Sequence, residues 1–417
     1  MMFTLRGHQN ELTALSFPPY DKDSLTNPLL ASGDSAGWLY LWDLVYRRPI
    51  RAWQAHPPIH STSGGILHLQ SFSTHLTTHL TDDCHELSIC IASQGRDNTV
   101  HIWSLNDIIC STAGKALDPQ LVSFGPSPTP IYSFPTNSLN FCRFAMAYKQ
   151  MDAFNHVLFA IPNLTDSNRI DIFDYTTRSY MIRSIGLESN THVKTGIVMC
   201  MQFFNQPESS TISTETRSDC LFLLAAGYES GHIIIWNVIN GTRLGIMQFH
   251  IEPVMSLDIV GRHQLSNLTI PVAPSKAGTW GVSVAADNQL VLFSTEFDHN
   301  GSVLEYHRTE LPSTGTSDVR IVFDGSEIIT AGWDGALRRF KPSKKLKCTN
   351  VVQAFKESIK CMECCPCFIT ELLVQNSLTS NSTQSKLLLQ PKQDTLSNKL
   401  DRHMIAIGSK DGRICLS

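Results

Sequence analysis

The sequence is poor in charged residues and has no long apolar run. Asp, Glu, Lys and Arg make up 17% of the 417 residues, against about 25% in average soluble proteins. The formal net charge of −4 gives no electrostatic attraction for DNA or RNA. No stretch of some 18 apolar residues occurs, so no membrane span is expected. The first residues also lack the apolar core of a signal peptide.

Motifs of catalysis and cofactor binding are missing as well. The chain has no Walker loop, dinucleotide fingerprint, nucleophile elbow or His-Glu-x-x-His motif. We therefore expect no enzymatic activity, no cofactor and no small-molecule substrate. The twelve cysteines are expected to stay reduced, as in an intracellular protein.

Two clusters of metal-ligand residue types need separate consideration. Cys361-Met-Glu-Cys364-Cys365-Pro-Cys367 has the look of a zinc clip, but a structural site needs a second ligand pair at a defined spacing, and none follows. The segment is also expected to form a strand. A second cluster lies in a predicted loop, where solvated histidines are favoured: His75, His79, Cys84 and His85. No metal site is predicted at either place.

What the sequence does contain is a repeat, clearest in Ile91–Trp103. This stretch predicts two short strands joined by a tight turn. Ser93, Asp97 and Trp103, together with the upstream His56, match the hydrogen-bonded tetrad of a WD-repeat blade. In such a blade the Asp carboxylate accepts a hydrogen bond from one nitrogen of the His. The other His nitrogen bonds the Ser hydroxyl, and this hydroxyl also accepts from the indole N–H of the Trp. A buried polar chain of this kind stabilises a blade only when every member is satisfied.

The pattern recurs along the whole chain. Counterparts of Trp103 stand at five further positions: Trp42, Phe173, Trp236, Phe293 and Phe340. A seventh copy is Ile405–Ser417. Seven units fit a closed ring, so we predict that residues 1–417 form one all-β domain, a seven-bladed WD40 β-propeller.

Most copies of the tetrad are expected to be incomplete. In blade 1, Ala36 stands where the Asp is needed. Blade 4 has Ser230 and Ala226 in place of Asp and Ser. Blades 3, 5 and 6 have Phe in place of Trp, although two of them keep other members: His250, Ser283 and Asp287 in blade 5, Thr330 and Asp334 in blade 6. Apolar packing between blades must therefore hold most of the ring.

The two ends of the sequence are expected to complete each other. The seventh copy supplies no outer strand, whereas residues 2–6 form a short strand that has no blade of its own. We predict that this N-terminal strand completes blade 7 and closes the ring, which removes exposed strand edges.

Five insertions are expected between the inner and second strands of their blades: 18–28, 74–87, 205–219, 261–278 and 368–402. They would emerge on one face of the disc, where surface loops tolerate insertion and also carry function. Residues 368–402 are polar and poor in aromatics, which predicts a disordered loop.

The opposite face, which bears the His and Asp turns, is the better candidate for binding partners. The turn residues there are Arg96, Tyr228, Glu229, Trp333 and Lys410. Trp, Tyr and Arg often dominate the energy of interfaces. For Trp333 two interpretations stay open, an exposed contact residue or a ring packed on its neighbouring blade.

Five phrases, in order, give the sequence a resemblance that is more specific than the generic repeat. They are Ser93–Asp97, Leu224–Gly231, His250–Asp258, Thr330–Asp334 and Gly408–Gly412. With them the chain resembles the ASTRA-associated protein 1 family of fungi and its animal relatives, the G-protein β-subunit-like protein 1 group.

The resemblance implies a non-enzymatic scaffold subunit of the nuclear ASTRA complex, present also in the cytoplasm. That complex is linked to chromatin remodelling. The partners implied are Tel2, Tti1 and Tti2 homologues, which support maturation of phosphatidylinositol-3-kinase-related kinases, and chaperone-associated ATPases. The chain has no counterpart of the long N-terminal helix of true Gβ subunits.

Two rival interpretations stay open. A propeller enzyme would need carboxylates or metal ligands around the central channel, but the expected inner strands carry mostly apolar and small residues. The other interpretation is an adaptor that recognises substrates of a ubiquitin ligase or histone tails. An acidic and aromatic rim at the mouth of the channel would favour it. Glu229 and Trp333 alone do not decide this question.

Overall fold

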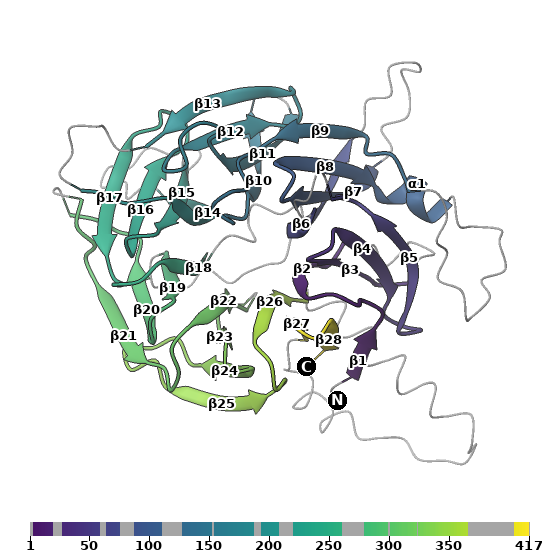
Figure 1. Cartoon of the computed structure of the whole chain (residues 1–417). Helices are drawn as coiled ribbons and strands as arrows, with labels where there is room; N and C mark the ends of the chain where they lie inside the picture. The colour runs from purple at the N-terminus through teal and green to yellow at the C-terminus, as the bar shows by residue number, and fades with distance from the viewer. Residues whose placement is uncertain are drawn as a thin grey trace, which may run out of the picture.

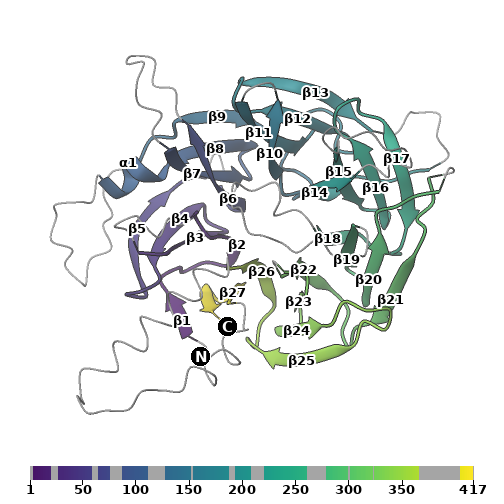
Figure 2. The same ribbon diagram turned by 180° about the vertical axis from the view of Figure 1, so that it is seen from behind.

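The computed structural model describes residues 3–19, 27–58, 64–75, 87–110, 127–151, 154–186, 193–207, 220–260, 279–298, 301–322, 324–365 and 404–416. In this part of the chain, seven four-stranded antiparallel sheets stand side by side in a ring (Figures 1 and 2). The predicted seven-bladed β-propeller is therefore confirmed.

Blades 1 to 3 follow one another along the chain, each with its strands in the order inner to outer. Blade 1 consists of β2 (Leu12–Ser16), β3 (Leu29–Asp34), β4 (Trp38–Asp43) and β5 (Arg48–Gln54). Blade 2 consists of β6 (Ile66–His75), β7 (Leu87–Gly95), β8 (Thr99–Ser104) and β9 (Tyr132–Pro135). Blade 3 consists of β10 (Ala145–Met151), β11 (Phe154–Pro162), β12 (Ile170–Asp174) and β13 (Ser179–Ile185).

Blades 4 to 6 repeat this order. Blade 4 consists of β14 (Val198–Pro207), β15 (Cys220–Tyr228), β16 (His232–Asn237) and β17 (Arg243–Gln248). Blade 5 consists of β18 (Val254–Ile259), β19 (Trp280–Ala285), β20 (Gln289–Ser294) and β21 (Tyr306–Glu310). Blade 6 consists of β22 (Thr316–Ile321), β23 (Ile328–Gly332), β24 (Ala336–Phe340) and β25 (Cys348–Gln353).

Blade 7 joins the two ends of the described chain. Its strands are β26 (Ile359–Cys364), β27 (Ile405–Ser409), β28 (Arg413–Leu416) and β1 (Phe3–Arg6). The outer strand β1 pairs antiparallel with β28, and Phe3 lies opposite Leu416. The predicted closure of the ring by the N-terminal strand is confirmed.

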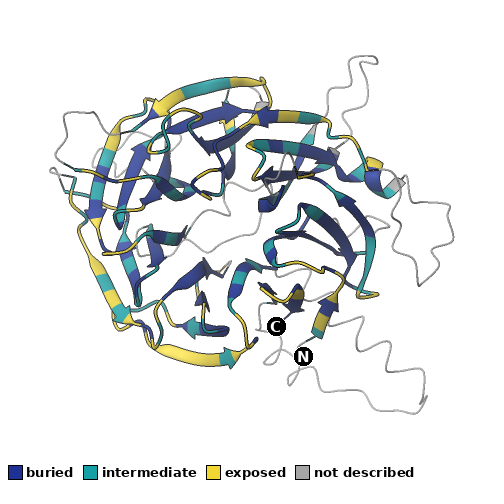
Figure 3. Cartoon of the chain, in the orientation of Figure 1, coloured by how far each residue is buried: buried dark blue, intermediate teal, exposed yellow. Residues whose placement is uncertain are grey.

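Apolar packing between neighbouring blades forms the core. Each of the seven buried clusters combines side chains from two adjacent sheets, so every junction of the ring has a core of its own. Both faces of a sheet are therefore covered, which explains why central strands such as β3 are buried at every residue. The outer strands face solvent, as Figure 3 shows for β13, β21 and β25.

The long connections lie where the sequence predicts them. All five predicted insertions fall between the inner and second strands of blades 1, 2, 4, 5 and 7. Their central parts lie outside the described residues, and residues 261–278 and 368–402 do so altogether. A sixth long connection, from β8 to β9, was not predicted, and it begins with the short helix α1 (Leu105–Cys110). No helix in the described part of the chain has the length and apolarity needed to cross a bilayer.

Candidate protein-interaction face

The four tetrad residues predicted for blade 2 form one continuous hydrogen-bonded chain. His56 Nδ1 donates to Asp97 Oδ2 (2.9 Å), and Ser93 Oγ donates to His56 Nε2 (2.8 Å). Trp103 Nε1 donates to Ser93 Oγ (2.8 Å). His56 lies between β5 and β6, Ser93 on β7 and Trp103 on β8, so the chain connects three segments of the blade. The turns between second and third strands and the connections between successive blades all lie on the same face of the ring. We call it the tetrad face.

Burial and hydrogen bonding act against each other on the Asp97 carboxyl. Burial raises its pKa, but the hydrogen bonds from His56 and Thr99 outweigh this effect and hold the pKa below its ordinary value. Asp97 therefore stays a carboxylate that accepts hydrogen bonds. Ser93 is fully buried, and its hydroxyl already serves His56 and Trp103. It has no exposed lone pair with which to attack a substrate.

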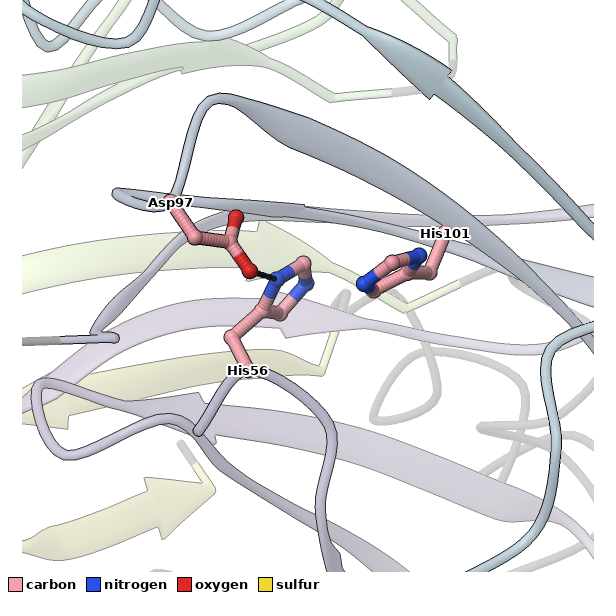
Figure 4. Close-up of side chains that lie close together, drawn as sticks. All are labelled: His56, Asp97 and His101. Carbon is pink, nitrogen blue, oxygen red and sulfur yellow. Dashed lines mark hydrogen bonds and ion pairs between the residues drawn. The ribbon is translucent and has the colours of Figure 1, made fainter. Parts of the chain in front are cut away.

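His101 lies beside this tetrad and completes a group with metal-ligand chemistry (Figure 4). Its ring stacks on His56, with 4.7 Å between the centroids. Both nitrogens of His56 are already hydrogen-bonded, so neither has a lone pair for a metal ion. His101 itself meets Ser133 Oγ (2.7 Å) and Thr99 Oγ1 (3.2 Å). The three side chains therefore form a structural cluster.

Blade 1 also has a complete tetrad, so the prediction of an incomplete one is wrong. His8 Nδ1 lies 2.9 Å from Asp34 Oδ2, His8 Nε2 lies 2.7 Å from Ser32 Oγ, and Trp42 Nε1 donates to Ser32 over 2.7 Å. The carboxylate comes from the last residue of β3, two positions before Ala36. Its Oδ1 accepts from the backbone N–H groups of Ala36 and Trp38, so Asp34 reaches the histidine from inside the turn.

Blades 4, 5 and 6 depart from the complete tetrad in different ways. In blade 5, His250 meets Asp287 (2.9 Å) and Ser283 (2.9 Å), as predicted. In blade 6, Asp334 pairs with Arg338 instead of a histidine. In blade 4, Ser230 bonds His232 on the next strand (2.8 Å).

Four of the five predicted contact residues lie on the surface of the tetrad face. Arg96, Glu229 and Lys410 are exposed, and the Trp333 side chain is 43% exposed. The prediction for Tyr228 is wrong, because this residue is 1% exposed and belongs to the core between blades 3 and 4. Strand β15 extends to Tyr228, and the side-chain alternation of the strand directs its ring inward.

Both interpretations of Trp333 describe part of its environment. A Cβ atom at Gly315 would lie only 2.0 Å from Trp333 Cε3, so one side of the indole packs against the backbone there. Trp333 nevertheless remains accessible to water. A preformed aromatic surface of this kind suits a protein contact.

Four exposed apolar residues on the same face were missed, one of them Leu164 (46%) in the turn between the second and third strands of blade 3. Leu139 (78%), Phe141 (57%) and Ile251 (86%) stand in connections between successive blades. Phe141 lies beneath the guanidinium of Arg96, with 4.8 Å between Arg96 Cζ and the ring centroid. The signal was present in the sequence, because Ile251 directly follows His250, where a polar turn residue would be expected.

A cavity of about 270 Å³ opens at the centre of this face. Its wall includes one residue from every inner strand except β10: Thr13, Leu67, Met199, Met255, Ser317 and Lys360. Each is the second residue of its strand, and each lies at an interruption of the pairing register. A β-bulge leaves one residue unpaired and re-aims its side chain. Six bulges therefore direct six side chains toward one centre.

Blade 3 has no such bulge at its inner strand, and Arg143 takes the corresponding place. Arg143 Nη1 lies 2.9 Å from Asp318 Oδ2 in blade 6, and Nη2 donates to the carbonyl of Lys360 in blade 7 (3.3 Å). The side chain thus crosses the central channel. Phe141 and Trp333 also line the cavity.

The inner strands therefore carry more charge than the sequence predicts. Asp318 is fully buried and accepts from Ser256 (2.8 Å) and Arg320 (2.7 Å) as well as from Arg143. Burial raises its pKa, but Arg320 and Arg143 outweigh this effect and hold it below the ordinary value. A carboxylate with so many donors and no exposed surface is poorly placed to act as a general base.

The cysteine cluster divides between two cores. Cys361 and Cys365 pack with blade 1, whereas Cys364 faces blade 6. Burial raises the pKa of Cys361 to about 12, while zinc binding requires thiolates. Cys367 lies outside the described residues, as do His79, Cys84 and His85 of the second cluster.

Comparison with known proteins places these features in a family. The model of the ASTRA-associated protein 1 family matches residues 1–417. The chain is 24% identical to ASTRA-associated protein 1 of Penicillium rubens, over 100% of this chain and 96% of that protein. It is 25% identical to the Aspergillus flavus protein of the same name, over 99% and 96%. The mouse guanine nucleotide-binding protein subunit beta-like protein 1 is 25% identical, over 81% and 82%. The chain therefore belongs to the ASTRA-associated protein 1 family.

Proposed function

We propose that this protein is a non-enzymatic interaction subunit of the ASTRA assembly and that it binds its partners through the tetrad face. Membership of the ASTRA-associated protein 1 family over the whole chain supports the assignment to this assembly. The observation that carries the choice of face is that Trp333, Phe141 and Ile251 are exposed there, with the exposed Arg96 stacked on Phe141. Aromatic and arginine side chains are enriched among the residues that contribute most to binding.

The geometry of the His–Asp–Ser sets supports a structural role for them. In blade 2 the serine is buried and hydrogen-bonded on both sides, and blade 1 repeats this arrangement. Such networks hold strands together. They support a rigid ring that presents its turns to other proteins.

The finer proposal concerns the place and partners of this subunit. We propose that it acts in the nucleus, and also in the cytoplasm, in chromatin remodelling. Its partners would be Tel2, Tti1 and Tti2 homologues, which mature phosphatidylinositol-3-kinase-related kinases, together with chaperone-associated ATPases. The names of the fungal relatives support the link to the assembly.

Affinity purification with quantitative mass spectrometry tests this proposal. The tagged wild type is compared with the double variant Trp333→Ala/Arg96→Ala, after a thermal melt has established that the variant is folded. A matched control is Tyr46→Ala/Arg48→Ala. Tyr46 is 65% exposed and lies 5.2 Å from the Arg48 guanidinium, in a turn between third and fourth strands on the opposite face.

We expect the wild type and the control to bring down the three homologues and the tetrad-face variant to lose them. Retention by both variants would contradict the choice of face and leave the assignment to the assembly standing. Absence of the homologues from the wild-type sample would contradict the assignment itself. The ring would then be better described as an adaptor that recognises a substrate or a histone tail.

A further inference from the structure

We infer that the cavity at the centre of the tetrad face receives a short acidic segment of a partner protein, with an apolar side chain beside a carboxylate. The inference rests on the proposed function, because it names the chemistry that the tetrad face recognises. Three observations carry it: the size of the cavity, the nature of its walls and the balance of charge around it.

The size favours a side chain over a cofactor. A volume of about 270 Å³ is below the roughly 300–1,000 Å³ of pockets for small molecules. One large apolar side chain is an occupant of the right size. The polypeptide that carries it would then lie across the turns of the tetrad face.

The walls are apolar on opposite sides of the ring. Phe141 comes from the entry to blade 3 and Trp333 from blade 6, and both are partly exposed to solvent. Between them, the bulges of blades 4 and 5 place Met199 and Met255 in the wall. Methionine adapts its shape to an incoming side chain, and its sulfur makes favourable contacts with aromatic rings.

Charge complementarity selects an acidic neighbour for that side chain. Three charged residues line the cavity: Glu11, Arg143 and Lys360. Glu11 already lies 2.7 Å from Lys360 Nζ, and the partner of Arg143, Asp318, has no exposed surface. The lining thus has one more cation than anions. An incoming carboxylate would meet two partly exposed cations, each already in one ion pair, whereas an incoming ammonium would meet a single carboxylate, which is also paired.

The tetrad face also carries exposed charges of both signs: Arg96 and Lys410, and Glu229 and Glu252. Arg96 stacks on Phe141, and Lys410 is exposed at the turn of blade 7. Within the described part of the chain, neither forms an ion pair. Both would strengthen the attraction for an acidic segment at low salt and lose this effect as salt rises.

A displayed library of random twelve-residue peptides, selected on the purified full chain, tests the inference. We expect the selected peptides to combine Asp or Glu with Leu, Met, Phe or Trp. Their affinity is then measured by fluorescence anisotropy, with the same peptides carrying Asn and Gln as the uncharged comparison.

Two variants with opposite expected effects sharpen the test. Lys360→Gln should weaken binding of the acidic peptides by about fivefold, and Glu11→Gln should strengthen it by a similar factor. Both side chains are partly exposed, so the fold should tolerate the changes. Lys345→Gln is the matched control, because this exposed lysine lies in a turn on the opposite face, and it should leave the affinity unchanged.

Selection of basic or uncharged peptides would overturn the inference, and so would equal affinity of wild type, Lys360→Gln and Glu11→Gln. Either result leaves the proposed function standing if the wild type still co-purifies with the ASTRA homologues. Conversely, acidic peptides that respond to both variants support the cavity chemistry even if those homologues are absent from the purification, in which case the assignment to the assembly fails.

Discussion

Arg143 and Asp318 lie 175 positions apart in the sequence, and their side chains meet across the middle of the ring. The pair connects blade 3 to blade 6, which share no sheet and no apolar cluster. Among the described residues, the apolar clusters each join two neighbouring blades. This ion pair is therefore a contact of a different kind, which ties opposite sides of the ring directly.

The first prediction follows from the unequal position of the two partners. Asp318→Asn should lower the free energy of unfolding by about 3 kcal/mol, because it removes the carboxylate that Arg143 and Arg320 share. Arg143 then loses this ion-pair partner, and Arg320 keeps the longer contact to Glu363 (3.7 Å). Arg143→Gln should cost less, about 1–2 kcal/mol, because Arg320 still neutralises the carboxylate. Urea unfolding followed by circular dichroism measures both. A larger loss for Arg143→Gln than for Asp318→Asn would contradict this account.

The second prediction concerns the shifted tetrad of blade 1. Asp34→Ala should destabilise the protein by about 2 kcal/mol, because His8 and two backbone N–H groups lose their acceptor. Ala36 stands at the position that the repeat pattern indicates for the Asp, but it lies outside the buried chain of side-chain hydrogen bonds. Adding Ala36→Asp to the Asp34→Ala variant should therefore not restore stability. Thermal melts of the single and double variants check this. Full rescue by the second substitution would show that either position can serve.

The third prediction is a pH dependence centred on His101. Burial lowers the pKa of His101 to about 4 from its ordinary value of 6.5. A histidine whose pKa is lower in the folded state binds its proton only on unfolding, so stability is complete above pH 6.5 and falls toward pH 4. His101→Gln should flatten this decline by up to about 1.4 kcal/mol per pH unit.

Unfolding free energies of wild type and His101→Gln, measured from pH 7.5 to pH 4, provide the check. Other buried histidines with lowered pKa values, such as His68, contribute equally to both proteins and cancel in the difference. Parallel curves for the two proteins would contradict the assignment of the slope to His101.

The fourth prediction concerns the closure of the ring. Leu5 on β1 is 1% exposed and packs in the core between blades 7 and 1. Leu5→Ala should cost about 3 kcal/mol because it leaves a cavity at the seam. Thr4→Ala, on the exposed side of the same strand, should change stability by less than about 0.5 kcal/mol. Equal, small effects in a chemical unfolding experiment would mean that β1 contributes little to stability.

Local pattern was enough to predict the blades, and it was insufficient for contacts that depend on the whole ring. The small-residue strands and turns gave seven units, and the unpaired residues 2–6 indicated how the ring closes. The fixed spacing from Ser93 to Asp97 misled the interpretation of blade 1, because Asp34 reaches its histidine from a different position. Tyr228 was misplaced because β15 continues one residue further than the turn pattern suggests.

The central site was the least predictable part. The period-two pattern of a strand predicts which side chains point to the same face of the sheet. A bulge changes the direction of one side chain and leaves no mark in the amino-acid composition of the strand. Nothing local to Thr13, Met199 or Lys360 indicates that these residues face one another. Their convergence, like the meeting of Arg143 and Asp318, follows only from the closed circle of seven sheets.

Pairing of β1 with β28 has a consequence for the order in which the protein is made. Strand β1 leaves the ribosome long before β28, and blade 7 can form only after β28 has followed. At about 5–20 residues per second, that delay is roughly 20–80 s. During this time six blades can assemble while β1 has no partner. The nascent chain therefore remains an open arc until β28 has been made, and the pairing of β28 with β1 converts it into a ring.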